Sequence, residues 1–177
     1  RATLLTQIGI MDGDGQLLGP DEMGEIVLSG DLVMTGYYKM PDKTAETIID
    51  GWLHTGDIGY IDSRGYVFIK DRIRDVVITG GFNVYPSDVE AVLGRHPDIR
   101  ECVVFGVADE KWGEAVHAAV ELHDGATTSP ADIIEFVKQQ LDSVKAPKAV
   151  HITQSLPRSS VGKVLRRAAK ELFAQGG

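Results

Sequence analysis

The sequence predicts an α+β protein, in which a β-rich N-terminal segment precedes a compact domain with a small mixed sheet flanked by helices. Two observations support this prediction. Glycine-containing turns separate short β-type runs in the first third of the chain, whereas strand and helix patterns alternate after residue 72. The alternating part spans roughly 100 residues, which is enough for one compact domain. We expect the boundary between the two parts in the charged segment 69–75.

The N-terminal segment, residues 1–70, contains runs that favour strands and one run that favours a helix. The expected strands are 25–28, 60–61 and 66–69, and 59–70 is expected to form a hairpin. Pro41 suits the first turn of a short helix over 40–49. Asp12 and Asp14 resemble the start of a calcium loop, but the third acidic ligand and the closing Glu of such a loop are missing. We therefore expect a solvated turn there.

The C-terminal segment, residues 76–177, has alternating strand and helix signals. The expected order is two short strands around Gly80-Gly81, a helix from Pro86, a buried strand at 101–107, an alternating strand at 114–122, a helix from Ser129, a strand at 149–153 and a final helix. In the alternating strand, one face is expected to carry Val116, Ala118, Val120 and Leu122. The final helix is expected to point inward with Leu165, Ala168, Ala169 and Leu172.

Composition and charge exclude several classes of protein. A formal net charge of −8 argues against general binding to nucleic acid. No apolar run approaches the ~20 residues of a membrane span. The single Cys102 excludes an intramolecular disulfide, fits a reducing cytoplasmic location, and is interpreted as a packed residue rather than a nucleophile. The chain starts with neither Met nor a signal-peptide pattern, so we expect a fragment of a longer protein.

The dipeptide Gly162-Lys163 is a pattern that many proteins use to hold a phosphate. It does not fit the P-loop motif, which needs a Gly five positions before the second Gly and a Ser or Thr after the Lys. Pro157 and Val164 occupy those two positions. A loop of this kind cannot place a hydroxyl on magnesium, so Lys163 needs another explanation.

Four stretches of the chain form a set in one order. They are GWLHTGD at 51–57, GYVFIKDRIRD at 65–75, VVITGGFNVYPSDVE at 76–90 and PRSSVGK at 157–163. Together they resemble the C-terminal part of the acyl-CoA synthetase family, the adenylate-forming ligases that activate carboxylic acids with ATP. The resemblance covers almost the whole chain. It implies that 1–70 is the β-rich end of an N-terminal adenylation domain, 71–75 a hinge and 76–177 the C-terminal lid domain.

The resemblance implies a nucleotide-binding role for Asp57 and Arg72. Asp57 matches a carboxylate that accepts hydrogen bonds from both ribose hydroxyls of ATP or AMP, and Arg72 matches an arginine that donates to the same ribose and toward the phosphate. Taken alone, Asp57 would be interpreted as a turn residue that bonds its own backbone. Arg74 occupies the hinge position, where relatives commonly have Asp or Lys. The alternative of a solvated charge run is kept for Asp75.

Gly80, Gly81 and Phe82 match the loop that flanks the pantetheine tunnel of CoA in the thioester-forming conformation. The two glycines permit a close approach that a Cβ would block, and Phe82 supplies an apolar wall. A plain Gly-Gly hairpin is the alternative interpretation. Ile78 stands where some relatives carry a lysine, which weakens any role for a second lysine. Trp112 is interpreted as a packed loop residue.

In the family, the lysine that matches Lys163 enters the active site only when the lid closes for adenylation. A carboxylate then attacks the α-phosphorus of ATP, and the ammonium neutralises the developing charge. The lid next rotates about Arg74, which withdraws Lys163 and presents the Gly80–Phe82 face for attack by the CoA thiol. Gly162 is expected to give the lysine loop its freedom.

The resemblance implies ATP or AMP and CoA as substrates, together with a carboxylic acid that we expect to be a fatty acid. Mg²⁺ is expected with ATP, but its ligand, the phosphate loop and the acid pocket would lie upstream of Arg1. We therefore expect the chain alone to be inactive in adenylation. Two alternatives stay open: a stand-alone lid-like module that docks onto a partner enzyme, and an acyl-AMP ligase that loads a carrier protein. The stretch 157–163 also resembles the context in which related ligases are switched off by lysine acetylation.

Overall fold

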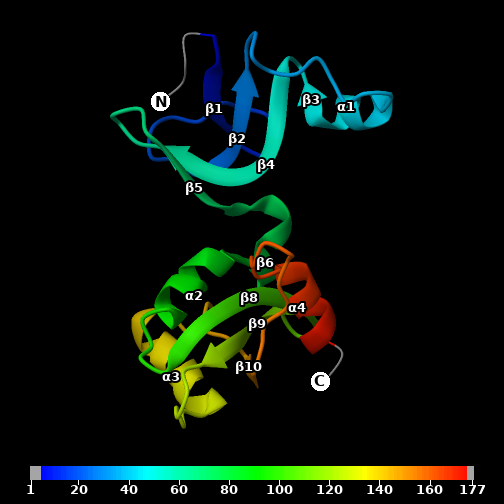
Figure 1. Ribbon diagram of the computed structural model, residues 1–177. Helices are drawn as coiled ribbons and strands as arrows, with labels where there is room; N and C mark the ends of the chain where they lie inside the picture. Colours follow the sequence, from blue (N-terminus) through cyan, green and yellow to red (C-terminus); the bar gives the residue numbers. More distant parts are fainter. Residues whose placement is uncertain (1–4, 175–177) are drawn as a thin grey trace. The chain divides into compact units, whose positions relative to one another are not determined.

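The computed structural model describes residues 5–174, and the chain divides into two compact units, Arg1–Arg74 and Asp75–Gly177 (Figure 1). We call them the N-terminal and the C-terminal unit. The division falls inside the expected 71–75 segment, but a hinge role there and the identities given to 1–70 and 76–177 stay predictions. The first four and last three residues of these ranges lie outside the described residues.

The N-terminal unit is an antiparallel sheet with one short helix. Its elements are β1 (Gln7–Met11), β2 (Gly24–Ser29), α1 (Pro41–Thr47), β3 (Ile48–Ile49), β4 (Trp52–Ile61) and β5 (Val67–Arg72). The long β4 pairs with β2, β3 and β5, and β1 adds to the outer edge of β2. The helix from Pro41 and the hairpin of β4 and β5 confirm the sequence prediction. The structure adds β1 and extends the strand at 60–61 back to Trp52.

Within the part of the chain that the structure describes, the same tight turn occurs three times, at residues 12–16, 62–66 and 159–163. In each, the N–H of the first residue donates to the carbonyl of the fifth, and the fourth residue is a glycine in the left-handed region, with φ of 81°, 81° and 85°. A side-chain oxygen of Asp12, Asp62 or Ser159 accepts a backbone N–H further along its own turn. This is the three-residue hairpin loop in which glycine forms a bulge. Asp12 therefore closes a turn.

The C-terminal unit contains the mixed sheet that the sequence predicts. Its elements are β6 (Val77–Thr79), β7 (Phe82–Val84), α2 (Pro86–Leu93), β8 (Ile99–Asp109), β9 (Gly113–Leu122), α3 (Pro130–Gln140), β10 (Ala149–Thr153) and α4 (Arg166–Phe173). β9 pairs antiparallel with β8 and parallel with β10, while β6 meets it only at Thr79 and Gly113. A 3-10 turn at Ile73–Asp75 precedes β6.

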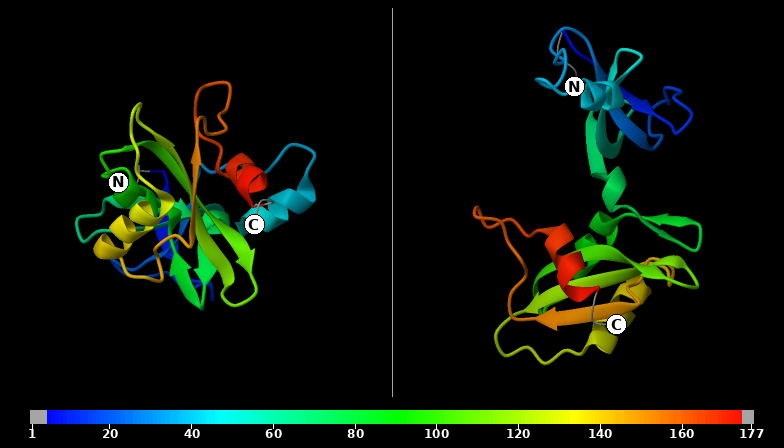
Figure 2. Two further views of the ribbon diagram at one scale, coloured as in Figure 1. Left: turned by 90° about the horizontal axis from the view of Figure 1, so that it is seen from below. Right: turned by 90° about the vertical axis from the view of Figure 1, so that its right-hand side faces the viewer.

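Helices cover both faces of this sheet. α2 and α3 lie on one face and α4 lies on the other (Figures 1 and 2). The first face of β9 carries Val116, Ala118 and Val120, as predicted, but Ala115 and Ala119 on the opposite face are also buried. The sequence prediction of a single buried face was therefore incomplete, because α4 covers the second one.

The final helix is predicted correctly only in part. Ala169 is buried, as predicted, and Phe173 packs beside it, but Leu165 and Leu172 are 40% and 60% exposed. Phe173 takes the inward place expected for Leu172, and Leu165 lies before the helix, which begins at Arg166. The start of α3 is as predicted, since Ser129 and Asp132 form a reciprocal capping box. Within residues 5–174, no helix combines the length and the apolar character that crossing a membrane requires.

Candidate functional site

The structure brings the two predicted nucleotide-binding residues, Asp57 and Arg72, together. They are direct partners on β4 and β5, and Arg72 Nε lies 3.6 Å from Asp57 Oδ1. The separation is longer than a hydrogen bond. The side chain of Asp57 is 34% exposed and that of Arg72 is 53% exposed. The carboxylate is therefore held near a cation while its oxygens stay accessible to hydroxyl donors.

A bulge in β4 sets the position of Asp57, and Glu25 on β2 braces it. Gly56 has φ of 73°, and its N–H donates to Glu25 Oε1 at 2.9 Å. Glu25 Oε2 lies 2.7 Å from His54 Nδ1. Thr55 Oγ1 accepts the Asp57 N–H at 3.1 Å. Sequence reasoning missed this brace, although a Gly before Asp57 and a Glu opening β2 were visible signals.

Arg74 is exposed on the 3-10 turn, while its neighbour Asp75 is not part of a solvated charge run. Arg166 donates from Nη1 to Asp75 Oδ2 at 2.9 Å and from Nη2 to Glu90 Oε1 at 2.9 Å. Asp71 is only 9% exposed. The interpretation of Asp75 as part of a solvated charge run was wrong, because Asp75 pairs with Arg166. This partner lies 91 positions away, so no local sequence pattern indicates it.

Gly80 and Gly81 form a two-residue hairpin loop between β6 and β7. Their φ values are 57° and 83°, the left-handed values of the loop type that glycine favours. Gly80 N–H donates to the Trp112 carbonyl at 2.8 Å, and a Cβ on Gly80 would lie 2.9 Å from the indole ring. Phe82 follows the loop and is 62% exposed. The three residues predicted to face CoA thus form the loop and the first position of β7.

Trp112 is packed against this hairpin and also partly open to solvent. Its side chain is 41% exposed, and the ammonium groups of Lys111 and Lys148 lie 4.9 Å and 5.8 Å from its ring centroid. The interpretation of Trp112 as a packed loop residue holds only in part, because its ring lies against Gly80 but the residue is 41% exposed. The Trp112 ring thus lies close to the glycine loop and to two cations.

Lys163 lies on a short hairpin that we call the lysine hairpin, residues 157–165, drawn in orange in Figure 2. A bridge between Arg158 and Val164 closes it, and Ser159 N–H donates to the Lys163 carbonyl at 2.8 Å. Lys163 is exposed. Gly162 is the bulge residue of the turn, and its left-handed conformation shapes that turn. The freedom that it is expected to give the loop stays a prediction.

A buried carboxylate, Glu121 on β9, lies beside the lysine hairpin. It is 1% exposed and accepts the Leu156 N–H, while Arg100 and Arg158 donate to its two oxygens. Burial alone would raise the pKa of Glu121, but the Leu156 N–H and the two guanidinium groups outweigh it and hold the pKa below its usual value. Sequence reasoning missed Glu121, because it considered only the face of β9 that carries Val116, Ala118, Val120 and Leu122.

The single cysteine is packed rather than reactive. Burial raises the pKa of Cys102 to about 12, so the interpretation of this thiol as a packed residue is confirmed.

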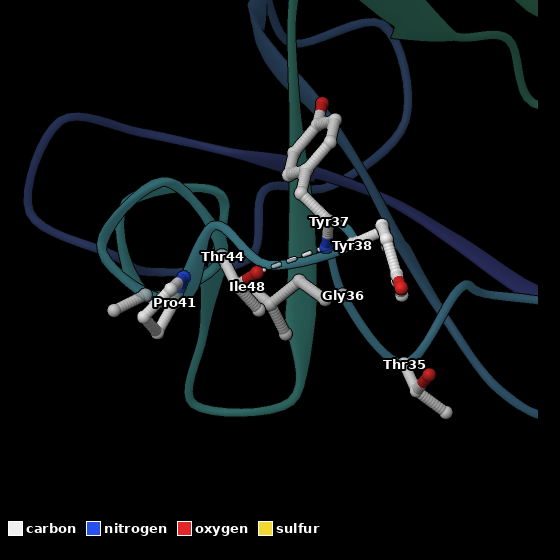
Figure 3. A pocket seen from close by; sticks show the side chains of 8 residues that line it. Thr35, Gly36, Tyr37, Tyr38, Pro41, Thr44 and Ile48 are labelled. Atoms are coloured by element: carbon white, nitrogen blue, oxygen red, sulfur yellow. Dashed lines mark hydrogen bonds between the residues drawn. The ribbon is translucent and has the colours of Figure 1, made fainter.

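Figure 3 shows an open hollow beside α1, in which Thr44 Oγ1 accepts the Tyr37 N–H at 2.9 Å. The hollow is lined by Thr35, Gly36, Tyr37, Tyr38, Pro41, Thr44, Ala45 and Ile48. None of the predicted site residues is among them.

The predicted residues therefore belong to two sets. Asp57 and Arg72 form a pair in the N-terminal unit, and the glycine loop and the lysine hairpin belong to the C-terminal unit. Residues 88–163 match the model of the AMP-binding enzyme C-terminal domain. Residues 88–163, within the C-terminal unit, belong to that family.

Relatives of this AMP-binding enzyme domain align along nearly the whole chain. ScoC of Streptomyces coeruleorubidus, a fatty acid–[acyl-carrier-protein] ligase, is 48% identical over 93% of this chain and 32% of its own length. FadD8 of Mycobacterium tuberculosis, a medium/long-chain-fatty-acid–CoA ligase, is 43% identical over 99% of this chain and 32% of its own length. The chain spans about a third of these relatives.

A solved structure extends the likeness to the fold. The ATP-bound crystal structure of MatB from Rhodopseudomonas palustris matches with a TM-score of 0.92 and 38% identity, over 98% of this chain and 35% of MatB. The α+β fold expected from the sequence is therefore confirmed, and so is the resemblance to the C-terminal part of adenylate-forming ligases.

Proposed function

We propose that this chain is the C-terminal part of an AMP-forming acid–thiol ligase, which activates a carboxylic acid with ATP and transfers the acyl group to CoA. The observation that carries the proposal is the 43% identity to the fatty-acid–CoA ligase FadD8 over 99% of this chain. A fatty acid is the expected substrate class, because both FadD8 and ScoC are named for fatty acids. A cytoplasmic location is part of the same proposal.

In the first step, a carboxylate oxygen of the acid attacks the α-phosphorus of ATP. The bond from this phosphorus to the bridging oxygen breaks, and pyrophosphate leaves with the electron pair. Two anions approach each other, so a nearby ammonium lowers the barrier by neutralising charge. We assign this role to Lys163, which keeps its proton throughout. Its short, closed hairpin limits the conformational entropy lost when the ammonium is positioned.

We assign the ribose of the nucleotide to Asp57 and Arg72. A carboxylate is an acceptor with two oxygens, which suits a vicinal diol, and a guanidinium beside it can donate to the sugar or to phosphate. The 34% exposure of Asp57 leaves room for such donors. Glu25 takes part indirectly, since it holds the bulge at Gly56.

In the second step, the CoA sulfur attacks the acyl carbonyl of the acyl-AMP. The thiol proton passes to solvent, and AMP leaves with the electron pair of the broken C–O bond. We assign the approach of CoA to Gly80, Gly81 and Phe82, and the rotation between the two steps to a hinge at Arg74. The left-handed conformation of both positions supports the assignment, because it favours glycine, whose missing Cβ allows a ligand to approach the loop backbone closely.

Mg²⁺ is expected to accompany ATP. Among residues 5–174, no group of three or more His, Cys, Asp or Glu side chains is arranged to hold a metal ion. The family resemblance implies that a protein ligand for Mg²⁺ lies outside this chain, and the roles assigned in both steps belong to this chain's own residues.

The proposal is tested by ATP–pyrophosphate exchange in the full-length gene product. Exchange that depends on a fatty acid, followed by release of acyl-CoA when CoA is added, is the expected result. The absence of acid-dependent exchange with any acid would contradict it and would favour the stand-alone lid-like module.

A second candidate function differs only in the acceptor of the acyl group. ScoC, at 48% identity over 93% of this chain, is named as a ligase for an acyl carrier protein. The thiol would then be that of a phosphopantetheinyl group on a protein. Parallel reactions with CoA and with holo carrier protein separate the two, since the true acceptor should give the higher kcat/KM.

A further inference from the structure

We propose that Arg158, held by the buried carboxylate of Glu121, positions the lysine hairpin and thereby Lys163. The catalytic consequence of this inference rests on the proposed function. The anchoring itself is a property of the C-terminal unit and can be measured separately. Arg158 and Glu121 are thus positioning residues, since neither is placed against a substrate.

Arg158 connects three parts of the C-terminal unit at once. Its Nη2 donates to Glu121 Oε1 at 3.0 Å and also to Glu101 on β8. Its Nη1 donates to the carbonyl of Gly162 at 3.2 Å. Gly162 directly precedes Lys163, so a single guanidinium links the sheet to the residue next to the predicted catalytic lysine. Only the planar fork of arginine can make these contacts together.

Glu121 holds the base of the hairpin as well as Arg158. Its Oε1 accepts the Leu156 N–H, and Leu156 is 2% exposed and immediately precedes the hairpin. Its Oε2 accepts from Arg100 Nε at 3.1 Å. A buried carboxylate is costly unless its partners compensate for lost hydration, so this site strongly favours one arrangement of those partners. Leu156, which leads into the hairpin, and Gly162 on its far side are therefore both held by the Glu121–Arg158 pair.

Without this anchor, the hairpin keeps its internal turn but loses its orientation. The bonds between Ser159 and Lys163, and the bulge at Gly162, do not involve Arg158 and would persist. The link from the Gly162 carbonyl to β8 and β9 would be lost. We therefore expect Glu121→Gln and Arg158→Lys to loosen the hairpin without unfolding the unit. Arg158→Lys keeps the charge and loses the fork.

The first measurement is hydrogen–deuterium exchange of the full-length gene product. Peptides covering 156–165 should exchange faster in Glu121→Gln and in Arg158→Lys, while peptides covering β8 and α3 should not change. Arg167→Gln is the matched control, because Arg167 is 92% exposed and pairs with Glu171 on its own helix. Unchanged exchange at 156–165 in both variants would overturn the inference, whatever the enzyme's activity.

The second measurement separates positioning from general destabilisation. Both variants should lower kcat for acyl-AMP formation by about 10- to 100-fold, since small misplacements of a catalytic group have effects of that size. KM for ATP should change little, and thioester formation from supplied acyl-AMP should match the control. Equal losses in both half-reactions would overturn the inference. If Lys163→Ala does not affect acyl-AMP formation, the proposed function fails, while faster exchange at 156–165 still supports the anchor.

Discussion

Arg72 Nε lies 3.6 Å from Asp57 Oδ1, and the two residues face each other across β4 and β5. The pair is too open to stabilise the fold appreciably, because exposed ion pairs contribute about 0–1 kcal/mol. We propose that its position at a braced bulge serves ligand binding. Two residues that lie 15 positions apart in the sequence thus present an acceptor and a donor on one edge of the N-terminal unit.

Changing this pair should affect nucleotide binding rather than stability. Asp57→Asn removes the negative charge and one acceptor oxygen, and should raise KM for ATP by about tenfold or more, since a hydrogen bond to a charged group contributes about 1.5–3 kcal/mol. The free energy of unfolding should change by less than about 0.5 kcal/mol. Steady-state kinetics and urea unfolding measure the two quantities. A large loss of stability with unchanged KM would contradict the assignment.

Removing the Glu25 side chain, which braces Asp57, should affect stability as well as nucleotide binding. Glu25→Gln keeps one acceptor for the Gly56 N–H but loses the charged contact with His54. Glu25→Ala leaves both groups without their partner, so we expect it to cost about 1–3 kcal/mol of stability and to raise KM for ATP. Chemical denaturation of the two variants, measured side by side, tests whether Glu25→Ala is less stable than Glu25→Gln. Equal stability of both variants would show that the brace is unimportant.

The glycine loop offers a matched pair of substitutions. Gly81→Ala places a Cβ in open space but in the left-handed region, at φ of 83°. This conformation costs about 1–2 kcal/mol for a residue with a side chain. Gly80→Ala adds a contact of 2.9 Å with the Trp112 ring, so it should be the more destabilising of the two. Unfolding in urea measures both. A smaller effect for Gly80→Ala would contradict the packing described for Trp112.

Two histidines predict how stability depends on pH. His117 Nδ1 lies 3.2 Å from His151 Nε2, and burial lowers the pKa of both residues, while their mutual proximity lowers the pKa of His117 further. Asp109 opposes part of this shift. The unfolded chain therefore binds protons more readily than the folded one. The stabilising effect is complete above the unfolded pKa of about 6.5 and is lost as pH falls through the lower folded values.

His151→Phe tests this pH dependence. The His151 ring stacks on Phe173 of α4 at a centroid distance of 5.2 Å, so a phenyl ring can replace it with little change in packing. The wild-type chain should lose stability as pH falls from above to below the ordinary histidine pKa of about 6.5, and the variant should lose less over the same range. Denaturation at several pH values measures the slope. A steeper slope in the variant would contradict the expected direction of the pKa shifts.

The sequence predicts the element order well where the signals are local. Pro41 and Ser129 mark helix starts, and the glycine at position 65 marks the turn of the β4–β5 hairpin. These features depend on a few neighbouring residues. The buried residues of α4 do not, because Leu172 and Phe173 are both apolar and only packing against Phe105 and Leu156 selects Phe173.

The site is predictable only in part, for a related reason. Asp57, Arg72 and Lys163 belong to motifs that can be read along the chain. The long-range contacts of the C-terminal unit cannot be read along the chain in this way, since Glu121 contacts Arg158 across 37 positions and Asp75 contacts Arg166 across 91. A glutamate in an alternating strand predicts exposure unless both faces of the sheet are known to be covered. Partner identity of this kind depends on the tertiary fold.

The central claim is that Lys163 acts in acyl-AMP formation and not in thioester formation. The measurement is the rate of each half-reaction for Lys163→Ala in the full-length gene product, with Lys138→Ala, an exposed lysine on α3, as the control. We expect Lys163→Ala to abolish most fatty-acid-dependent pyrophosphate release, by about 100-fold or more as for loss of a charge-stabilising group. Thioester formation from supplied acyl-AMP should equal that of the control. Equal loss in both half-reactions, or no loss of pyrophosphate release, would contradict the account.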